Sequence, residues 1–230
     1  MQLYSIRLFM NSKVILLIVF VAVACFFSCK KDGEKLPDTI YNQITLINAG
    51  GDTLNVYENG TRINNGSTLL PSGQYRNLQI VAGTQRYQFK KAGNPNMLFE
   101  TELKLDTPFV YTVFVAGQSS DKVFALRGID TMRTDTTAHI RYVNASPDAG
   151  NIDFTISSYP TVKGVAFKSA TSFVKVPKGK VYYSMVRPDG SVLASGNLTL
   201  SGGVSYNLFS KGLVAGKGTS ALGARILVAQ

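Results

Sequence analysis

Short apolar stretches separated by turn residues dominate the chain after residue 40. Between residues 44 and 127, seven segments alternate apolar and polar positions or run apolar, with many Val, Ile, Tyr, Phe and Thr residues: ITLIN, TLNVYE, YRNLQIV, RYQFK, FETELKL, FVYTVFVA and KVFALR. Asn59-Gly60, Asn65-Gly66 and Pro188-Asp-Gly190 favour the positive φ angles of tight turns. No stretch carries the 3.6-residue apolar stripe of a stable helix, so the pattern predicts β-structure throughout.

The number and spacing of these segments predict the fold class. Seven or eight short strands within about a hundred residues are typical of an immunoglobulin-like β-sandwich. The chain has 230 residues, two Cys and no Trp. Its core must therefore come from Phe, Tyr, Val, Ile and Leu, and the 45% hydrophobic content excludes wholesale disorder.

Three blocks recur in the same order along the chain, which indicates a tandem repeat. Ile44–Glu58 aligns with Ile140–Thr155 at a shift of 96 residues, and Leu103–Gly117 aligns with Leu198–Gly212 at a shift of 95. Between them, the turn at residues 71–73 (Pro-Ser-Gly) is aligned with the turn at residues 177–179 (Pro-Lys-Gly). Two copies are fewer than a solenoid needs, so we expect two globular domains.

The N-terminal segment has the layout of a secretory signal peptide. Arg7 and Lys13 precede the uncharged run Val14–Phe27, and Ser28-Cys29 and a polar segment follow. This run is shorter than the roughly 20 apolar residues of a membrane-spanning helix. The small residue before Cys29 resembles the cleavage site of a bacterial lipoprotein signal. Cys25 is the rival site, and an ordinary signal peptide without lipidation is the other alternative.

Cleavage before Cys29 would leave a membrane-anchored chain without a free thiol. The lipid on Cys29 would include palmitate-like acyl chains, and no disulfide, thiolate nucleophile or Cys-based metal site would remain. Lys30 rather than Asp follows Cys29, so the inner-membrane retention signal of some bacteria is absent. We therefore expect an outer-membrane lipoprotein that faces the periplasm or the cell surface.

The expected organisation is all-β, with two tandem immunoglobulin-like β-sandwich domains after a lipoprotein signal peptide. A polar, Thr-rich segment separates the two repeats. The expected parts are a signal peptide (1–28), a lipidated tether (29–39), a first sandwich (40–128), a linker (129–138) and a second sandwich (139–230).

The second repeat resembles the bacterial domain-of-unknown-function family numbered 4397. The resemblance rests on HIRYVNASPDAGNIDF, GVAFKSATSFVKVPKGKVYYSMV and a SYNLF strand, all within residues 139–212. The first repeat is a degenerate copy, which keeps Asn48-Ala49 but has Gly50-Gly51 in place of Ser146-Pro147. The resemblance implies an extracytoplasmic β-sandwich in a secreted or lipid-anchored protein, and it implies no assigned activity.

The residues offer little catalytic chemistry. His139 is the only imidazole, so Ser-His-Asp, Cys-His and His-rich zinc sites are excluded. Residues 212–223 lack the spacing and the strand–loop–helix context of a phosphate-binding loop. We expect no catalytic residue, no metal and no cofactor apart from the covalent lipid. Paired carboxylates remain the one route to a hydrolase.

One Asn and one Asp recur at the same place in both repeats, before a new strand. These residues are Asn48 and Asp52 in the first repeat, and Asn144 and Asp148 in the second. Such side chains commonly bond to backbone amides in turns, so we expect structural turn caps. A calcium-binding or catalytic role is the alternative.

Positive charge is concentrated in the second repeat. Residues 38–128 contain 8 basic and 7 acidic residues, whereas residues 139–230 contain 10 basic and 3 acidic ones. Five lysines lie around the turn at residues 177–179: Lys163, Lys168, Lys175, Lys178 and Lys180. They form either a solvated face or a docking surface for a polyanion such as an acidic glycan. Nucleic acid is not an expected partner, because the chain is exported and lacks a recognised binding motif.

Taken together, the sequence predicts a lipid-anchored envelope protein that is not an enzyme. It would act as a binding or structural module, with the membrane and an envelope protein as partners. The alternative is a surface protein that captures an anionic polysaccharide through the basic second domain. A carboxylate-based hydrolase is the third hypothesis.

Overall fold

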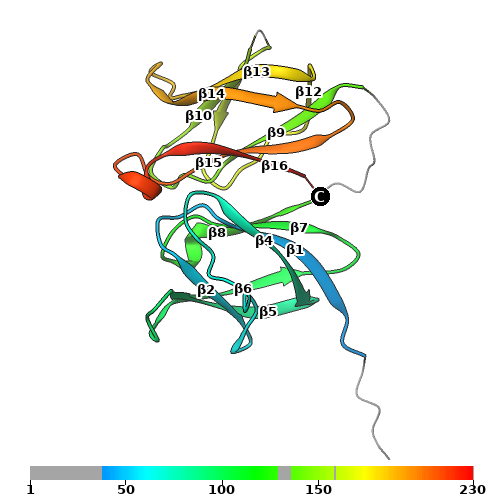
Figure 1. Ribbon diagram of the computed structural model, residues 1–230, viewed down its shortest axis with the longest axis vertical. Coiled ribbons are helices and arrows are strands. Elements are labelled where there is room, and N and C mark those ends of the chain that lie inside the picture. Colours follow the sequence, from blue (N-terminus) through cyan, green and yellow to red (C-terminus); the bar gives the residue numbers. More distant parts are fainter. Residues whose placement is uncertain (1–37, 129–135, 158, 230) are drawn as a thin grey trace, which may run out of the picture. The chain divides into compact units, whose positions relative to one another are not determined.

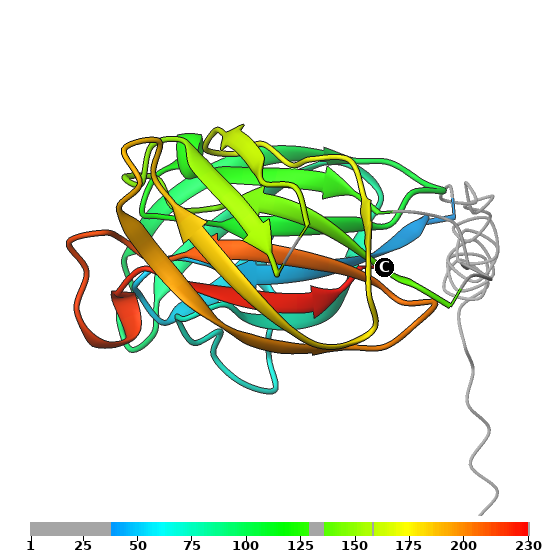
Figure 2. The ribbon, with the colours of Figure 1, turned by 90° about the horizontal axis from the view of Figure 1, so that it is seen from above.

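The computed structural model describes residues 38–128, 136–157 and 159–229, and nearly all of its elements are β-strands (Figures 1 and 2). The prediction of an all-β chain with two sandwich domains is confirmed. The predicted signal peptide with Cys29, nearly all of the tether and most of the linker lie outside the described residues. The described part contains no helix of the length and hydrophobicity needed to cross a membrane.

The first sandwich consists of two four-stranded sheets. One has the order β4-β1-β7-β8 and the other the order β3-β2-β5-β6. All neighbouring strands are antiparallel except β1 and β7, which are parallel. The strand bounds are β1 Tyr41–Asn48, β2 Leu54–Glu58, β3 Thr61–Arg62, β4 Gln74–Val81, β5 Gly83–Lys91, β6 Met97–Leu105, β7 Tyr111–Val115 and β8 Val123–Arg127.

The second sandwich repeats this topology strand for strand. Its sheets have the orders β12-β9-β15-β16 and β11-β10-β13-β14, and β9 and β15 form the parallel pair. Two short 3-10 turns, η1 (Ser120–Lys122) and η2 (Gly218–Ser220), occupy equivalent loops. The strand bounds are β9 Ala138–Asn144, β10 Ile152–Ile156, β11 Val162–Val165, β12 Val174–Val176, β13 Gly179–Val186, β14 Val192–Leu200, β15 Ser205–Lys211 and β16 Gly223–Val228.

Each sandwich encloses its own apolar core, because side chains alternate between the two faces of a strand. In the first core the rings of Phe89 and Phe99 stack with centroids 4.7 Å apart. In the second core Tyr142 stacks on Phe154 at 5.0 Å. Burial raises the pKa of Tyr142 to about 12.

The strand pairing corrects one block of the sequence alignment. Gly83 (φ +96°) begins β5 and Gly179 (φ +104°) begins β13, and these strands have the same neighbours in the two sheets. The turn at residues 177–179 therefore corresponds to residues 81–83 and not to residues 71–73. The counterpart of residues 71–73 is residues 166–168. Gly73 N donates to the carbonyl oxygen of Asn48 and Lys168 N to that of Asn144, each at 2.9 Å, and both residues have positive φ, +76° and +65°. The alignment failed because turns with similar chemistry stand before different strands.

A third apolar cluster joins the two sandwiches, and residues 39–230 form one compact unit. The cluster lies on the outward faces of β1, β7, β9 and β15. As a result, β9 and β15 are buried along their whole length, on both faces. The outward face of one sheet in each sandwich is thus covered by the other sandwich.

Candidate functional site

The two sandwiches meet through equivalent residues. Phe114 on β7 and Phe209 on β15 are counterparts in the repeat, and their rings contact each other edge to face with centroids 5.3 Å apart. Both rings are almost fully buried. A self-equivalent contact of this kind is the mark of an isologous interface, here formed between two halves of one chain.

Hydrogen bonds across this interface are reciprocal as well. Ser72 Oγ donates to the carbonyl oxygen of Thr219 at 2.6 Å, next to η2. Lys168 Nζ, from the equivalent turn, donates to the carbonyl oxygen of Asp121 in η1 at 3.0 Å. Each sandwich therefore presents the same turn to the same loop of the other, which gives the interface two comparable halves.

One half of the interface is filled by aromatic rings. Phe124 on β8 stacks on Phe114 with centroids 4.9 Å apart and an interplanar angle of 7°. Phe167, from the loop before β12, contacts the edge of Phe124 at 6.1 Å. The three rings close this half.

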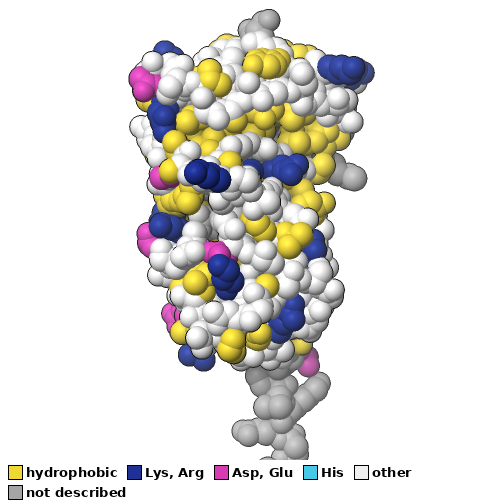
Figure 3. Space-filling model, turned by 60° about the vertical axis from the view of Figure 1, so that its left-hand side comes forward, with side chains coloured by type: hydrophobic (Ala, Val, Ile, Leu, Met, Phe, Trp, Pro, Cys, Tyr) yellow, Lys and Arg dark blue, Asp and Glu magenta, His cyan; other side chains and the backbone are white. Residues whose placement is uncertain are grey.

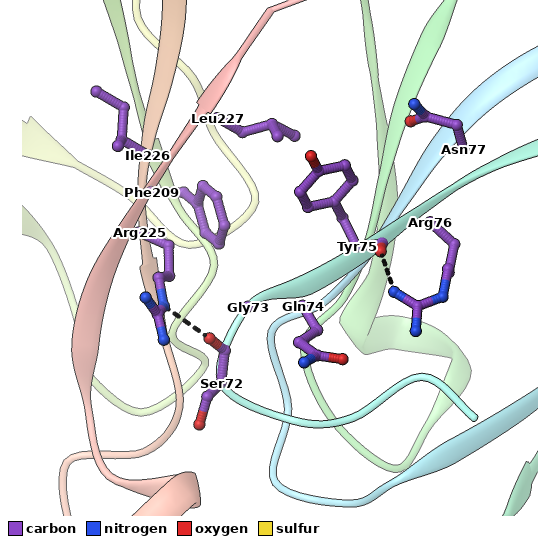
Figure 4. A pocket seen from close by; sticks show the side chains of 10 residues that line it. All are labelled: Ser72, Gly73, Gln74, Tyr75, Arg76, Asn77, Phe209, Arg225, Ile226 and Leu227. Carbon is purple, nitrogen blue, oxygen red and sulfur yellow. Dashed lines mark hydrogen bonds between the residues drawn. The ribbon is translucent and has the colours of Figure 1, made fainter. Parts of the chain in front are cut away.

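The other half is open. Arg225 pairs with Phe209 in the sheet as Phe124 pairs with Phe114. Ser72 occupies the position equivalent to Phe167, because each precedes the residue whose backbone amide donates to the carbonyl oxygen of Asn48 or Asn144. The open half thus has an arginine and a serine where the filled half has two phenylalanines. A cleft of about 590 Å³ lies here, between β4 of the first sandwich and β15 and β16 of the second (Figure 4).

The cleft combines an aromatic ring, amide groups and a guanidinium. Tyr75, which is 45% exposed, extends from β4 toward Leu227 on the facing strand (Figure 4). Gln74 and Asn77 are exposed on the same strand. Arg225 Nε donates to the carbonyl oxygen of Ser72 at 3.0 Å, which positions the guanidinium at the edge of the cleft.

Positive charge is the electrostatic character of the cleft. None of the ten described residues that line it is acidic. Burial lowers the pKa of the nearby Lys211, and the positive charge of Arg225 lowers it further. Arg76 also lines the cleft, but its side chain lies on the other side of the β4 backbone and donates to the carbonyl oxygen of Tyr75 at 2.8 Å. This arrangement favours an anionic ligand that can also pack against a ring.

The close approach of the two sandwiches at the cleft depends on Gly73. Its φ of +76° is in the left-handed region, and a Cβ atom there would lie 2.7 Å from Arg225 Cγ and 3.2 Å from Phe209 Cε2. A residue without a side chain is therefore required for both conformation and space.

A smaller hollow of about 260 Å³ with a mixed polar and apolar lining adjoins the cleft, on the other side of β16. It lies between β14 and β16, and Tyr183, Leu198 and Ile226 line it. Figure 3 shows hydrophobic side chains gathered in a hollow on the second sandwich, with Lys and Arg side chains below it. The face of the second sandwich that Figure 3 shows thus carries apolar surface bordered by cations.

The recurring asparagines bond to backbone groups in the same way in both repeats. Asn48 Nδ2 donates to the carbonyl oxygens of Asp52 and Leu69, and its Oδ1 accepts from the amide of Gly50 at 3.1 Å. Asn144 repeats this pattern, as described below, and both side chains are fully buried. These residues hold the loops that follow β1 and β9.

The recurring aspartates differ from each other. Asp52 Oδ1 lies 2.8 Å from Lys91 Nζ, and Gln118 Nε2 donates to Asp52 Oδ2. The hydrogen bond from Lys91 holds the pKa of Asp52 below its usual range. Asp148 instead accepts from the backbone amide of Val214, with both oxygens 3.0 Å from that nitrogen. Within the described residues, no group of three or more His, Cys, Asp or Glu side chains could hold a metal ion.

The structure does not bring the five predicted lysines onto one face. Lys175 lies between Val174 and Val176, which face the core, so its side chain leaves the sheet that contains β9. Lys180 is next to the core residue Val181 on β13, in the other sheet. Lys168 reaches the first sandwich, and the remaining two are exposed, Lys163 on β11 and Lys178 in the turn before β13. His139 is buried on β9, near Thr137 Oγ1.

Sequence reasoning did not single out Tyr75 and Arg225, which line the cleft. The signal was present in the repeat: in the register defined by strand pairing, Arg225 stands where the first repeat has Phe124. The aligned blocks end at Gly117 and Gly212, before these two positions, and loops of unequal length follow.

A family model, "Domain of unknown function (DUF4397)", matches the chain at residues 42–155 and again at residues 138–226. The chain belongs to this family. The two matched segments agree with two repeats of the family domain. No curated protein is detectably similar to the chain in sequence.

Three solved structures are similar to the DUF4397 chain at low levels. A family 26 carbohydrate-binding module from Eubacterium rectale Amy13K, in complex with maltoheptaose, shares 11% identity over 81% of this chain and 95% of its own, with a TM-score of 0.25. Family 41 modules from streptococcal virulence factors, described for α-glucan recognition, share 13% over 73% and 92%, with a TM-score of 0.24. A leucine-rich repeat protein from Bacteroides thetaiotaomicron shares 16% over 73% and 25%, with a TM-score of 0.18. No function is transferred at these scores.

Proposed function

We propose that this chain is a non-catalytic ligand-binding lipoprotein of the bacterial outer membrane, anchored through Cys29, and that its ligand is an anionic glycan. The observation that carries the proposal is the difference between the two halves of the interface. One half is filled by Phe124 and Phe167, whereas the other is open and presents Tyr75 and Arg225.

The side chains in the cleft are better suited to binding an acidic sugar than to catalysing a reaction. An exposed tyrosine ring provides an apolar surface with a polar edge, on which a sugar ring can pack. Arginine binds a carboxylate through two parallel hydrogen bonds, and amides such as those of Gln74 and Asn77 bond to hydroxyls. We infer that uronic-acid residues are the recognised feature. The site therefore lies in the cleft and not on the scattered lysines of the second repeat.

Binding of defined oligosaccharides tests this proposal. Calorimetry with oligogalacturonates as acidic probes and dextran oligomers as neutral probes should show binding of the acidic series alone. Tyr75→Ala and Arg225→Gln should each weaken binding at least about tenfold, because each removes one of the principal contacts. Tyr182→Ala is the matched control, since Tyr182 is 50% exposed on the outer face of β13.

Each result has a distinct meaning. If acidic oligosaccharides bind the Tyr75 and Arg225 variants as well as they bind the wild type, the cleft is not the binding site. Loss of binding in Lys175→Gln, Lys178→Gln and Lys180→Gln would assign the binding site to the lysines. Absence of binding in every series would refute the proposal that the ligand is a glycan. Time-dependent release of reducing ends by the wild-type protein would refute a non-catalytic role.

Anchoring and location need separate experiments. Labelled palmitate should be incorporated into the wild-type chain in cells and not into Cys29→Ser. Protease treatment of intact cells should remove the second sandwich if it faces outward, whereas protection until the outer membrane is broken would indicate the periplasm. Incorporation into Cys29→Ser but not Cys25→Ser would move the anchor to Cys25.

A further inference from the structure

A buried cation lies in the interface between the sandwiches, on the outward face of the second one. Arg141 on β9 is 8% exposed and pairs in register with Asn207 on β15, which is fully buried. Arg141 Nε donates to Asn207 Oδ1 at 2.8 Å, and Arg141 Nη1 donates to the carbonyl oxygen of Arg127 at 3.1 Å. The first of these bonds fixes the orientation of the amide, because only its oxygen can accept.

Two adjacent donors remain unsatisfied in this arrangement. Among the described residues, Arg141 Nη2 and Asn207 Nδ2 are the buried side-chain nitrogens without a hydrogen-bond partner. Buried polar groups in native proteins nearly always have partners, because an unmade bond costs about 1–3 kcal/mol. Two such donors on bonded side chains indicate a site for an acceptor.

The charge of Arg141 indicates that this acceptor is an anion. None of the three ion pairs among the described residues includes Arg141. Its guanidinium lies 4.9 Å from the centroid of the Phe173 ring, which provides only partial compensation. An arginine remains protonated in proteins, and burial lowers the pKa of Arg141, as expected for a charge that is removed from water.

The site is not a requirement of the fold. The equivalent positions in the first sandwich are Thr45 on β1 and Thr112 on β7, which are buried and neutral. One sandwich therefore packs its outward face with hydroxyls, whereas the other has a cation and an amide. This exchange lies on β1, β7, β9 and β15, the strands whose outward faces meet at the interface.

We propose that a small monovalent anion of the size of chloride binds between Arg141 Nη2 and Asn207 Nδ2, and that it stabilises the packing of the two sandwiches. The anion accepts one hydrogen bond from each nitrogen and balances the guanidinium charge. This site is separate from the cleft at Tyr75 and does not depend on the proposed glycan.

Bromide diffraction tests the site directly on the wild-type protein. Crystals soaked in sodium bromide should show an anomalous peak within hydrogen-bonding distance of both nitrogens. An ordered water at this position without an anomalous signal would overturn the proposal, as would a position with no density.

Thermal unfolding provides a second readout. At constant ionic strength, replacing gluconate by chloride should raise the unfolding midpoint by about 3 °C for each tenfold increase above the dissociation constant. Arg141→Met should abolish this dependence while Arg76→Met, a control in a solvent-accessible arginine, should keep it. Equal midpoints of the wild type in the two salts would refute the proposal, even if Arg141→Met does not fold.

Discussion

The side chain of Asn144 should be the most costly single polar group to remove from the second sandwich. Its Nδ2 donates to the carbonyl oxygens of Gly150 at 2.8 Å and Val165 at 2.9 Å. Its Oδ1 accepts from the amide of Ser146 at 3.1 Å and from Ser210 Oγ at 3.0 Å. We therefore consider Asn144→Ala, which removes all four hydrogen bonds from a site without solvent access.

The expected loss follows from the partners that remain behind. A typical hydrogen bond contributes about 1 kcal/mol net, and a buried group left without a partner costs about 1–3 kcal/mol. Ser210 keeps a second bond, to the amide of Ala145, but the two carbonyl oxygens lose their amide donor. We expect the free energy of unfolding to fall by about 4 kcal/mol, a large share of the 5–15 kcal/mol typical of a domain.

Guanidinium chloride unfolding, followed by circular dichroism, measures this loss. Asn197→Ala is the matched control, because Asn197 is exposed on β14 and should change the stability by less than about 0.5 kcal/mol. Asn144→Asp keeps the acceptor but places an oxygen against two carbonyl oxygens, so it should be destabilised as well, and less so at low pH, where a protonated carboxyl can donate. A loss below about 1 kcal/mol for Asn144→Ala would refute the reasoning.

Two further predictions concern charge and backbone. Because Lys91 lowers the pKa of Asp52, this pair stabilises the folded state above the unfolded-state pKa of about 4, and its contribution is lost as the pH falls through the lower folded value. Unfolding at pH 3 and pH 6 should show a smaller pH effect in Asp52→Asn, and an unchanged effect would contradict this. Gly73→Ala should cost more stability than Gly93→Ala, because Gly93 has nearly the same φ (+78°) but open space around a Cβ atom, and for Gly93→Ala we expect a loss of about 1 kcal/mol. Equal losses in denaturant unfolding would show that contact with Arg225 is unimportant.

The internal faces of the strands were predictable from the sequence. Alternation in the first repeat placed β1, β2 and β4 to β8 correctly, because each has one face in a core. Asn48 and Asn144 recur because the loops that follow β1 and β9 need the same donors, although their complete burial was not predicted. The strand pattern and this recurrence both depend on short-range features that the two copies share.

The outward faces were not predictable in the same way. His139, Arg141 and Asn207 alternate with apolar residues, a pattern that indicates a solvated face. All three are buried, because the outward face of their sheet packs against the other sandwich. The five lysines illustrate the opposite error, since residues close in sequence on successive strands can leave the sandwich from opposite sheets.

Duplication explains why the candidate ligand site lies at the interface. Two identical sandwiches that meet about a two-fold would form two identical halves, both filled or both open. Here Arg225 and Ser72 stand where the filled half has Phe124 and Phe167, which opens one half without loss of the other. Edge-to-face ring contacts still hold the sandwiches together. The contacts in the filled half hold the sandwiches together, so the stability of the interface does not depend on the side chains of the open half. Those side chains can therefore change. A binding cleft can therefore arise in a duplicated fold by the removal of side chains from only one of two equivalent contacts.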